Sequence, residues 1–226
     1  MRKLAIPGLL SFNGGFVDTA GFLALQGLFT AHVTGNFVTL GAALVFGTHG
    51  IIAKLIALPE FMLVVVIARV LGNEFGKKGF DALWLLLGLE ALLLIAFFLL
   101  AVTLGPFPDS DAPLALLVGF AGVAAMAIQN AVQRVHFASI PPTTIMTGNT
   151  TQAVLDAVDL WRGETSGDRT AVKARFGRTI RGIAWFAAGC AAAAGSYFWV
   201  GLFCLALPAL VAVITAISSR SLESLK

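Results

Sequence analysis

The sequence predicts an all-α, multi-pass membrane protein whose six transmembrane helices form two inverted three-helix repeats. The chain has 226 residues, of which 58% are hydrophobic and 12% charged, and its mean hydropathy is +0.90. Soluble domains carry about twice that share of charge. Apolar windows long enough to cross a bilayer recur six times. The tripeptide Thr-Gly-Asn occurs at 34–36 and again at 147–149, half a chain length later.

The six apolar windows are the predicted transmembrane helices of a single membrane domain. The first window carries Asn13 and Asp18, is too long for a signal peptide and lacks a clear cleavage site, so we interpret it as a retained helix. Repeat 1 is predicted over 1–104 and repeat 2 over 114–226. Three crossings per repeat is an odd number, so repeat 2 must be inverted, as is common in secondary transporters. The windows are 4–28, 51–73, 82–104, 114–134, 179–199 and 201–217.

The distribution of Lys and Arg predicts the orientation. Six crossings, with both Thr-Gly-Asn segments returning to the side they came from, place every basic loop on one side and the acidic link 105–113 on the other. Basic loops stay in the cytoplasm, so both termini are predicted to be cytoplasmic. Full crossing of both motif segments would give eight spans and fits this rule less well. The basic residues of these loops and of the two termini are Arg2, Lys3, Lys77, Lys78, Arg162, Arg169, Lys173, Arg175, Arg178, Arg220 and Lys226.

Each Thr-Gly-Asn is predicted to lie where a short strand enters a re-entrant half-helix. Pro141 and Pro142 cannot continue the preceding helix, Thr or Asn favours an N-cap, and Gly allows close approach of a ligand. A half-helix of about 12 residues rises about 18 Å, so its N-terminus would lie near the membrane centre. Two positive N-termini would then share a chamber for an anion. The alternative is a capped interfacial helix. The predicted substrate-binding residues are Thr34, Gly35, Asn36, Thr147, Gly148, Asn149, Gln129 and Asn130.

Asp18 and His32 are the predicted proton-coupling residues. Asp18 lies mid-helix, where a lone charge costs at least ~2.5 kcal/mol. Its alternative role is a neutral acid hydrogen-bonded to Asn13 or to a neighbouring helix. His32 is close enough to Thr34 to exchange a proton with a bound solute, or is only a loop-edge histidine.

Other polar residues in the spans have two readings each. Gln129 and Asn130 either face the cavity, as repeat partners of Val17 and Asp18, or join helices by hydrogen bonds. We interpret Arg69 and Glu90 as structural, through an ion pair or snorkelling to the interface.

Several functions lack support in the sequence. The cysteines and the three histidines show no metal-ligand spacing, so no metal or other cofactor is predicted. No convincing nucleophile and base are present, so we expect no enzyme activity. Basic residues collect in short loops, so nucleic acid is not an expected partner. The small-residue stretch 189–196, "GCAAAAGS", allows close helix approach, either within the bundle or in a homodimer.

The stretches "GGFVDTAGFLALQGLFTAHVTGN" and "AMAIQNAVQR…TTIMTGNTTQ" resemble the YoaK-like family of bacterial inner-membrane proteins of unknown function, over nearly the whole chain. The resemblance implies a polytopic inner-membrane protein and supplies no substrate. The strand and half-helix also resemble, in architecture, the substrate site of uracil and sulfate transporters. The leading hypothesis is a proton-coupled secondary transporter for a small anionic or polar solute. A channel-like passive pore and a non-transporting scaffold are the alternatives.

Overall fold

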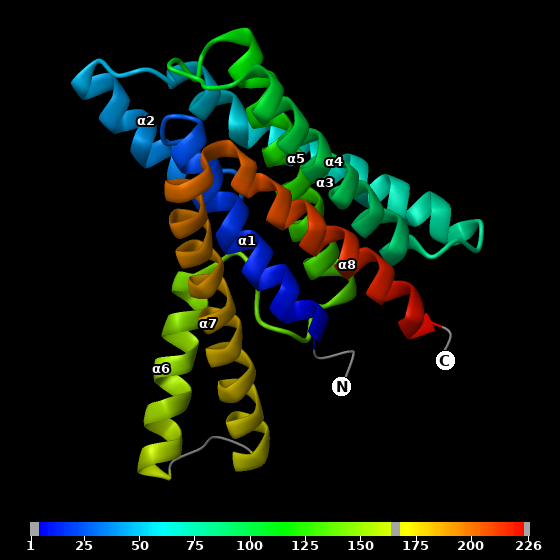
Figure 1. The fold of residues 1–226 in the computed structure, drawn as a ribbon. Coiled ribbons are helices and arrows are strands. Elements are labelled where there is room, and N and C mark those ends of the chain that lie inside the picture. The colour runs from blue at the N-terminus through cyan, green and yellow to red at the C-terminus, as the bar shows by residue number, and fades with distance from the viewer. Residues whose placement is uncertain (1–4, 164–167, 224–226) are drawn as a thin grey trace.

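Helices account for nearly all of residues 5–163 and 168–223, the part of the chain that the computed structural model describes (Figure 1). This part contains no β-strand, so the predicted strands before the two motifs are wrong. Those segments are irregular loops, because no extended neighbour offers them a hydrogen-bonding ladder. The elements are α1 (Ala5–Ala24), α2 (Gly35–Phe46), α3 (Ile51–Lys77), α4 (Ala82–Leu104), α5 (Pro113–His136), α6 (Met146–Arg162), α7 (Arg169–Val200), the 3-10 helix η2 (Gly201–Leu205) and α8 (Ala206–Glu223).

Local signals in the sequence explain where several helices begin and end. The Asp81 carboxylate accepts the Trp84 N–H at 3.0 Å and starts α4, while Asp168 accepts the Thr170 N–H at 2.9 Å and starts α7. These are N-caps that satisfy otherwise free backbone donors. Gly47 and Gly163 end α2 and α6 in the left-handed conformation, with φ of 65° and 73°, which glycine adopts without steric cost.

Four helical segments are long and apolar enough to cross a membrane among the described residues, namely α3, α4, α5 and the continuous stretch Arg169–Arg220. The last has 52 residues, about twice what one crossing needs. The chain reverses direction within it at η2, so α7 and α8 lie as two separate rods (Figure 1). A multi-pass helical membrane protein follows from these lengths and compositions.

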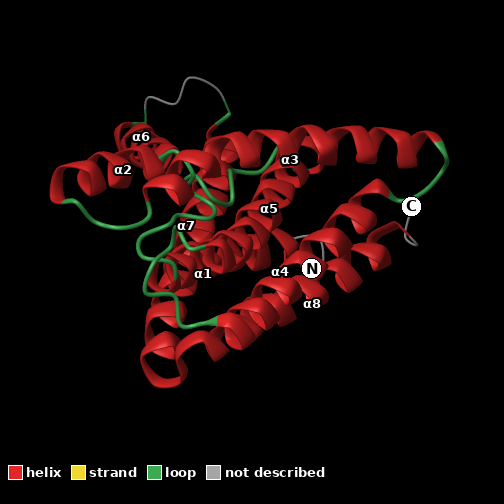
Figure 2. Ribbon diagram, turned by 90° about the horizontal axis from the view of Figure 1, so that it is seen from above, coloured by secondary structure: helices red, strands yellow, loops and turns green. Residues whose placement is uncertain are grey.

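The helix α1 lies inside the bundle, packed against α7, α8 and α5, and α4 lies between α5 and α8 (Figure 2). The short helices are peripheral: of the described helices, only α3 packs against α2 and only α7 packs against α6. The α6 helix and the first half of α7 form a hairpin that extends beyond the other helices (Figure 1). Arg2, Lys3 and Lys226, on which part of the predicted orientation depends, lie outside the described residues.

The small-residue stretch of α7 packs inside the bundle, against α1. A Cβ on Gly189 would fall on the Phe12 carbonyl, and a Cβ on Gly15 would fall on the Phe186 carbonyl. The thiol of Cys190 also donates to the Gly15 carbonyl at 3.4 Å. The stretch "GCAAAAGS" is predicted to allow close helix approach either within the bundle or in a homodimer. At Gly189 the close approach is to α1, within the bundle.

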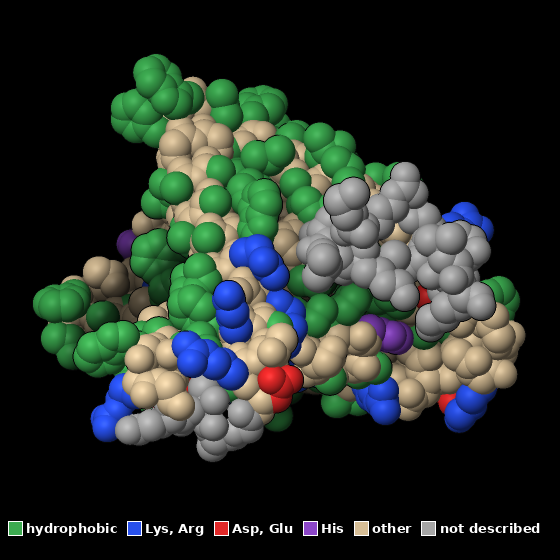
Figure 3. Space-filling view, turned by 90° about the horizontal axis from the view of Figure 1, so that it is seen from below, with side chains coloured by type: hydrophobic (Ala, Val, Ile, Leu, Met, Phe, Trp, Pro, Cys, Tyr) green, Lys and Arg blue, Asp and Glu red, His purple; other side chains and the backbone are tan. Residues whose placement is uncertain are grey.

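The surface separates into an apolar belt and a basic face. Large apolar side chains of α2 and α3 are exposed, among them Val45 and Leu63, as expected where lipid rather than water is the solvent. Lys and Arg side chains gather on the face toward which the α6–α7 hairpin points (Figure 3).

Candidate functional site

The two Thr-Gly-Asn motifs close their loops in the same way. Asn36 donates its amide to the Phe29 carbonyl at 2.9 Å and accepts the Phe29 N–H at 2.8 Å. Asn149 donates its amide to the Pro142 carbonyl at 2.7 Å, again seven residues upstream. The bond from the Phe29 N–H to Asn36 has no counterpart at the second motif, because Pro142 has no N–H. Both asparagines are buried, so their amides serve the loop backbone.

Residues of α1 and α5 tether these loops at equivalent places. The Asp18 Oδ1 atom accepts the N–H groups of Thr30, Ala31 and His32 at 2.9, 2.8 and 3.2 Å. Asn130, which the sequence aligns with Asp18, accepts the Thr144 hydroxyl through its Oδ1 at 2.7 Å. Thr144 is the residue half a chain length after Ala31. One loop is therefore held by a carboxylate and the other by a neutral amide.

The first loop (25–34) and the second loop (137–145) both pack between α1 and α5, two helical turns apart. The Thr30 methyl lies 2.8 Å and 3.1 Å from where a Cβ would stand on Gly21 of α1 and Gly122 of α5. The second loop contacts Gly14 of α1 and Gln129 of α5, where the Gln129 amide donates to the Thr143 hydroxyl at 3.2 Å. Gly14 and Gly21 are seven residues apart, which is about 10 Å along a helix.

Other predicted site residues lie outside the loop interior. Thr34 and Thr147 are exposed, and neither caps a helix with its side chain: Thr34 makes no cap bond and α6 begins after Ile145. Thr34 is thus at the N-cap position of α2 without a side-chain bond, and neither motif threonine caps a helix through its hydroxyl. Gly35 lies beside the Phe29 ring, Gly148 has open space around it, and His32 is exposed.

The α2 and α6 helices do not contact each other and extend in different directions from the α1–α5 pair (Figure 1). The two helices are thus not in contact, and the single chamber between both helix N-termini stays a prediction. Their loops approach the centre, but buried apolar side chains of Val17 and Met126 occupy the positions between them along α1 and α5.

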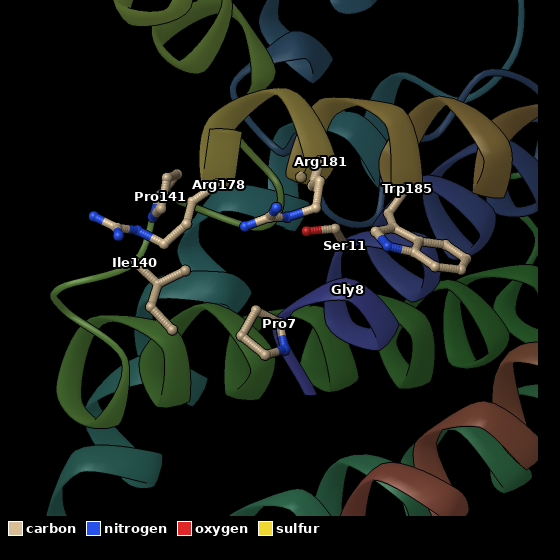
Figure 4. A pocket seen from close by; sticks show the side chains of 9 residues that line it. Pro7, Gly8, Ser11, Ile140, Pro141, Arg178, Arg181 and Trp185 are labelled. Atoms are coloured by element: carbon tan, nitrogen blue, oxygen red, sulfur yellow. The ribbon is translucent and has the colours of Figure 1, made fainter. Parts of the chain in front are cut away.

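Two cavities adjoin the 137–145 loop, which precedes the second motif. One, of about 70 Å³, lies between the start of α1, the 137–145 loop and α7, with Ser11, Pro141, Arg178 and Arg181 in its lining (Figure 4). The other, of about 480 Å³, shares Arg178 and the loop residues, and adds Gly148 and Asn149 of the motif, with Arg134 and Arg175. Thr147 faces a separate hollow.

Of the arginines that line these cavities, Arg175 is paired with an acid, whereas Arg178 and Arg181 are not paired with a described carboxylate. Arg175 binds Asp156 through three contacts of 2.6 to 3.2 Å, and this guanidinium lowers the pKa of Asp156. Arg178 and Arg181 follow along α7 and form no ion pair with a described carboxylate. The Arg178 Nε is buried and has no hydrogen-bond partner in the described structure. Two positive charges therefore remain available to an anion in the cavities.

Sequence reasoning identified some of this site and missed the rest. Gln129, Asn130, Gly148 and Asn149 do gather at the second loop. For Arg178 the sequence predicts only a contribution to topology, because nothing in its spacing indicates that it faces the loop. Glu90 was expected to pair with Arg69 or to reach the interface. That interpretation is wrong, because Glu90 is 1% exposed and both its carboxyl oxygens are unpartnered in the described structure.

Comparisons with known proteins agree on one family. The family model described as "Protein of unknown function (DUF1275)" matches residues 6–218. The UPF0700 transmembrane protein YoaK of Bacillus subtilis (strain 168) is 32% identical over 142 residues. That alignment covers 62% of this chain and 60% of the relative, so the chain spans less than two thirds of the relative's length. No solved structure matches the chain.

Proposed function

The chain belongs to the family described as proteins of unknown function (DUF1275), and from that premise we propose that it is a secondary transporter for a small anionic solute. The observation that carries the proposal is the pair of cavities at the second motif, where Arg178 and Arg181 have no acidic partner among the described residues. The proposed membrane is the bacterial inner membrane, with the basic face in the cytoplasm.

An inverted repeat of three plus three crossings is part of the proposal. Helices α1 to α4 would correspond to α5 to α8, and the packing is reciprocal: α1 packs on α7 as α5 packs on α3, and α1 packs on α8 as α5 packs on α4. The matching asparagine bonds at Phe29 and Pro142 support the same correspondence. Transporters with this plan bind solute near the repeat interface and alternate between two openings.

The solute is proposed to enter from the basic side. The two guanidinium groups would bind a carboxylate, phosphate or sulfate, with charge-assisted hydrogen bonds each worth about 1.5–3 kcal/mol. The Gly148 backbone and the α6 N-terminus line the same cavity. Movement of the 137–145 loop, whose Thr143 hydroxyl accepts the Gln129 amide, would pass the solute toward the centre of the α1–α5 pair.

Proton coupling through Asp18, with His32 beside it, belongs to the same proposal. Protonation of the Asp18 carboxylate would weaken the acceptor of three backbone N–H groups. The first loop would then be released from α1. A pH gradient could in this way open the side opposite the arginine cavities.

Uptake into proteoliposomes tests this function. We expect saturable uptake of at least one small anion from a panel of carboxylates, phosphate and sulfate. In Arg178→Gln/Arg181→Gln, uptake at low solute concentration should fall about 100-fold, since two charge-assisted contacts are lost.

Lys173→Gln provides the matched control, because Lys173 is an exposed base of α7 that lines neither cavity. It should transport like the unmodified protein. Flux that does not saturate and is unchanged in Arg178→Gln/Arg181→Gln would instead indicate a passive pore. No flux across the panel would leave a non-transporting scaffold.

A further inference from the structure

Glu90 is an acid buried without compensation in the middle of α4. It is 1% exposed, and neither carboxyl oxygen has a hydrogen-bond partner in the described structure. The neighbouring buried residues of α4 are apolar, including Leu86, Leu87 and Leu94. A buried carboxylate normally binds a cation or several donors, so this environment disfavours the ionised form.

Two amides from other helices lie at the same level of the bundle. Asn13 of α1 is the polar side chain beside the Glu90 carboxyl, but the two do not meet as a hydrogen bond, and both polar atoms of the Asn13 amide are unpartnered. Gln129 of α5 donates to the Leu10 carbonyl at 2.9 Å, one turn before Asn13, and its Oε1 is buried without a partner. Three helices thus contribute buried polar atoms without partners at one level of the bundle.

We propose that Glu90, Asn13 and Gln129 form a proton-binding site in the core of the bundle. The neutral acid supplies one O–H donor, and either of the two amide oxygens, each lacking a donor, can accept it. Proton binding at Glu90 follows from burial and does not require transport. Its use as a second coupling group, in addition to Asp18, rests on the proposed transporter function.

No charged group of the neighbouring described helices pairs with the Glu90 carboxyl. Arg69 and His136 line a cavity with Ala82 and Leu86, and Arg220 lies 4.8 Å from the centre of the Trp84 ring. All three are therefore grouped around the first turns of α4, toward the basic face. Glu90 lies one turn beyond Leu86 along α4. Glu60, in the first half of α3, is the other acid of the helices packed against α4 that lies in the apolar belt.

Labelling with dicyclohexylcarbodiimide tests the site in the purified full chain. A protonated carboxyl adds across a C=N bond of this apolar reagent and rearranges to a stable N-acylurea, which mass spectrometry locates. We expect modification of Glu90 at neutral pH, and its loss in Glu90→Gln. Modification should decline at least tenfold at strongly alkaline pH, where the acid ionises.

Glu74→Gln is the control, because Glu74 is exposed and paired with Lys77 at 2.6 Å. It should leave the labelling of Glu90 unchanged. The neutral isostere Glu90→Gln should unfold at the same temperature as the unmodified protein, since it removes no partner. Two results would overturn the proposal: absence of label on Glu90 at neutral pH, or suppression of the label by sodium ions, which would indicate a cation site.

Flux separates this inference from the transporter proposal. In proteoliposomes, Glu90→Gln should retain saturable anion uptake but lose most of its acceleration by a pH gradient. If the unmodified protein transports nothing, the transporter proposal fails, while labelling of Glu90 still decides whether the core binds a proton. Labelled Glu90 with unchanged pH dependence in Glu90→Gln would refute its coupling role.

Discussion

Replacing Gly189 with alanine is expected to lower the free energy of unfolding by about 3 kcal/mol, the upper end of what overpacking a tight contact costs. The added methyl group would fall on the Phe12 carbonyl and lie 3.0 Å from the Phe16 nitrogen. Both are backbone atoms of α1, so no side chain can rotate away and the two helices must separate. Thermal unfolding in detergent, with the yield of monodisperse protein, measures this effect.

The same helix provides the control for Gly189. Gly195 is exposed and a Cβ there meets nothing within 4 Å, so Gly195→Ala should be as stable as the unmodified protein or slightly more stable, since alanine is the better helix former. A Gly189→Ala protein that unfolds at the unmodified temperature would contradict the close α1–α7 contact.

Replacing Asp18 with alanine is expected to cost about 3 kcal/mol or more. The change removes the one acceptor of the Thr30, Ala31 and His32 N–H groups, and each buried donor left unsatisfied costs about 1–3 kcal/mol. Asp18→Asn keeps an oxygen acceptor and should remain folded, while losing the charge that proton coupling requires. Unfolding temperature separates the two variants, and uptake driven by a pH gradient then tests coupling in Asp18→Asn.

The second loop offers a graded comparison for Asp18. Asn130→Ala removes the acceptor of a single hydroxyl, that of Thr144, and should cost about 1 kcal/mol. The tether argument therefore requires Asp18→Ala to be the less stable of the two. The reverse order, or an Asp18→Ala protein of unchanged stability, would show that the carboxylate does not hold the first loop.

The sequence was a reliable guide to where the long helices lie. Each of the six apolar windows coincides with a helix, from α1 to α8, because side-chain hydropathy and helix formation are both local properties. The apolar window at 179–199 does not include the charged start of α7. This helix begins at Arg169, ten residues before the window. Its extra turns are held by α6 through the Arg175–Asp156 contact, which no local pattern contains.

The candidate site was harder to predict, because its geometry depends on contacts far apart in the chain. The repeated Thr-Gly-Asn did mark two equivalent loops, yet their asparagines bind the loop backbone and the α2 and α6 helices that follow do not contact each other. Nothing in the pattern around Glu90 distinguished an acid near a helix end from one fully buried where α4 packs between α5 and α8. Likewise, the local sequence predicts for Arg178 only a place in a basic loop. Its position in a cavity beside the 137–145 loop follows only from the three-dimensional structure.

Cysteine accessibility at two equivalent links tests the inverted repeat most directly. In a Cys190→Ser/Cys204→Ser background, single cysteines replace Thr48, in the α2–α3 link, and Thr170, at the start of α7; both positions are exposed. A membrane-impermeant maleimide applied to intact spheroplasts should label position 48 and leave position 170 unlabelled until the membrane is opened. Labelling of both positions from the same side would contradict the inversion of the two halves.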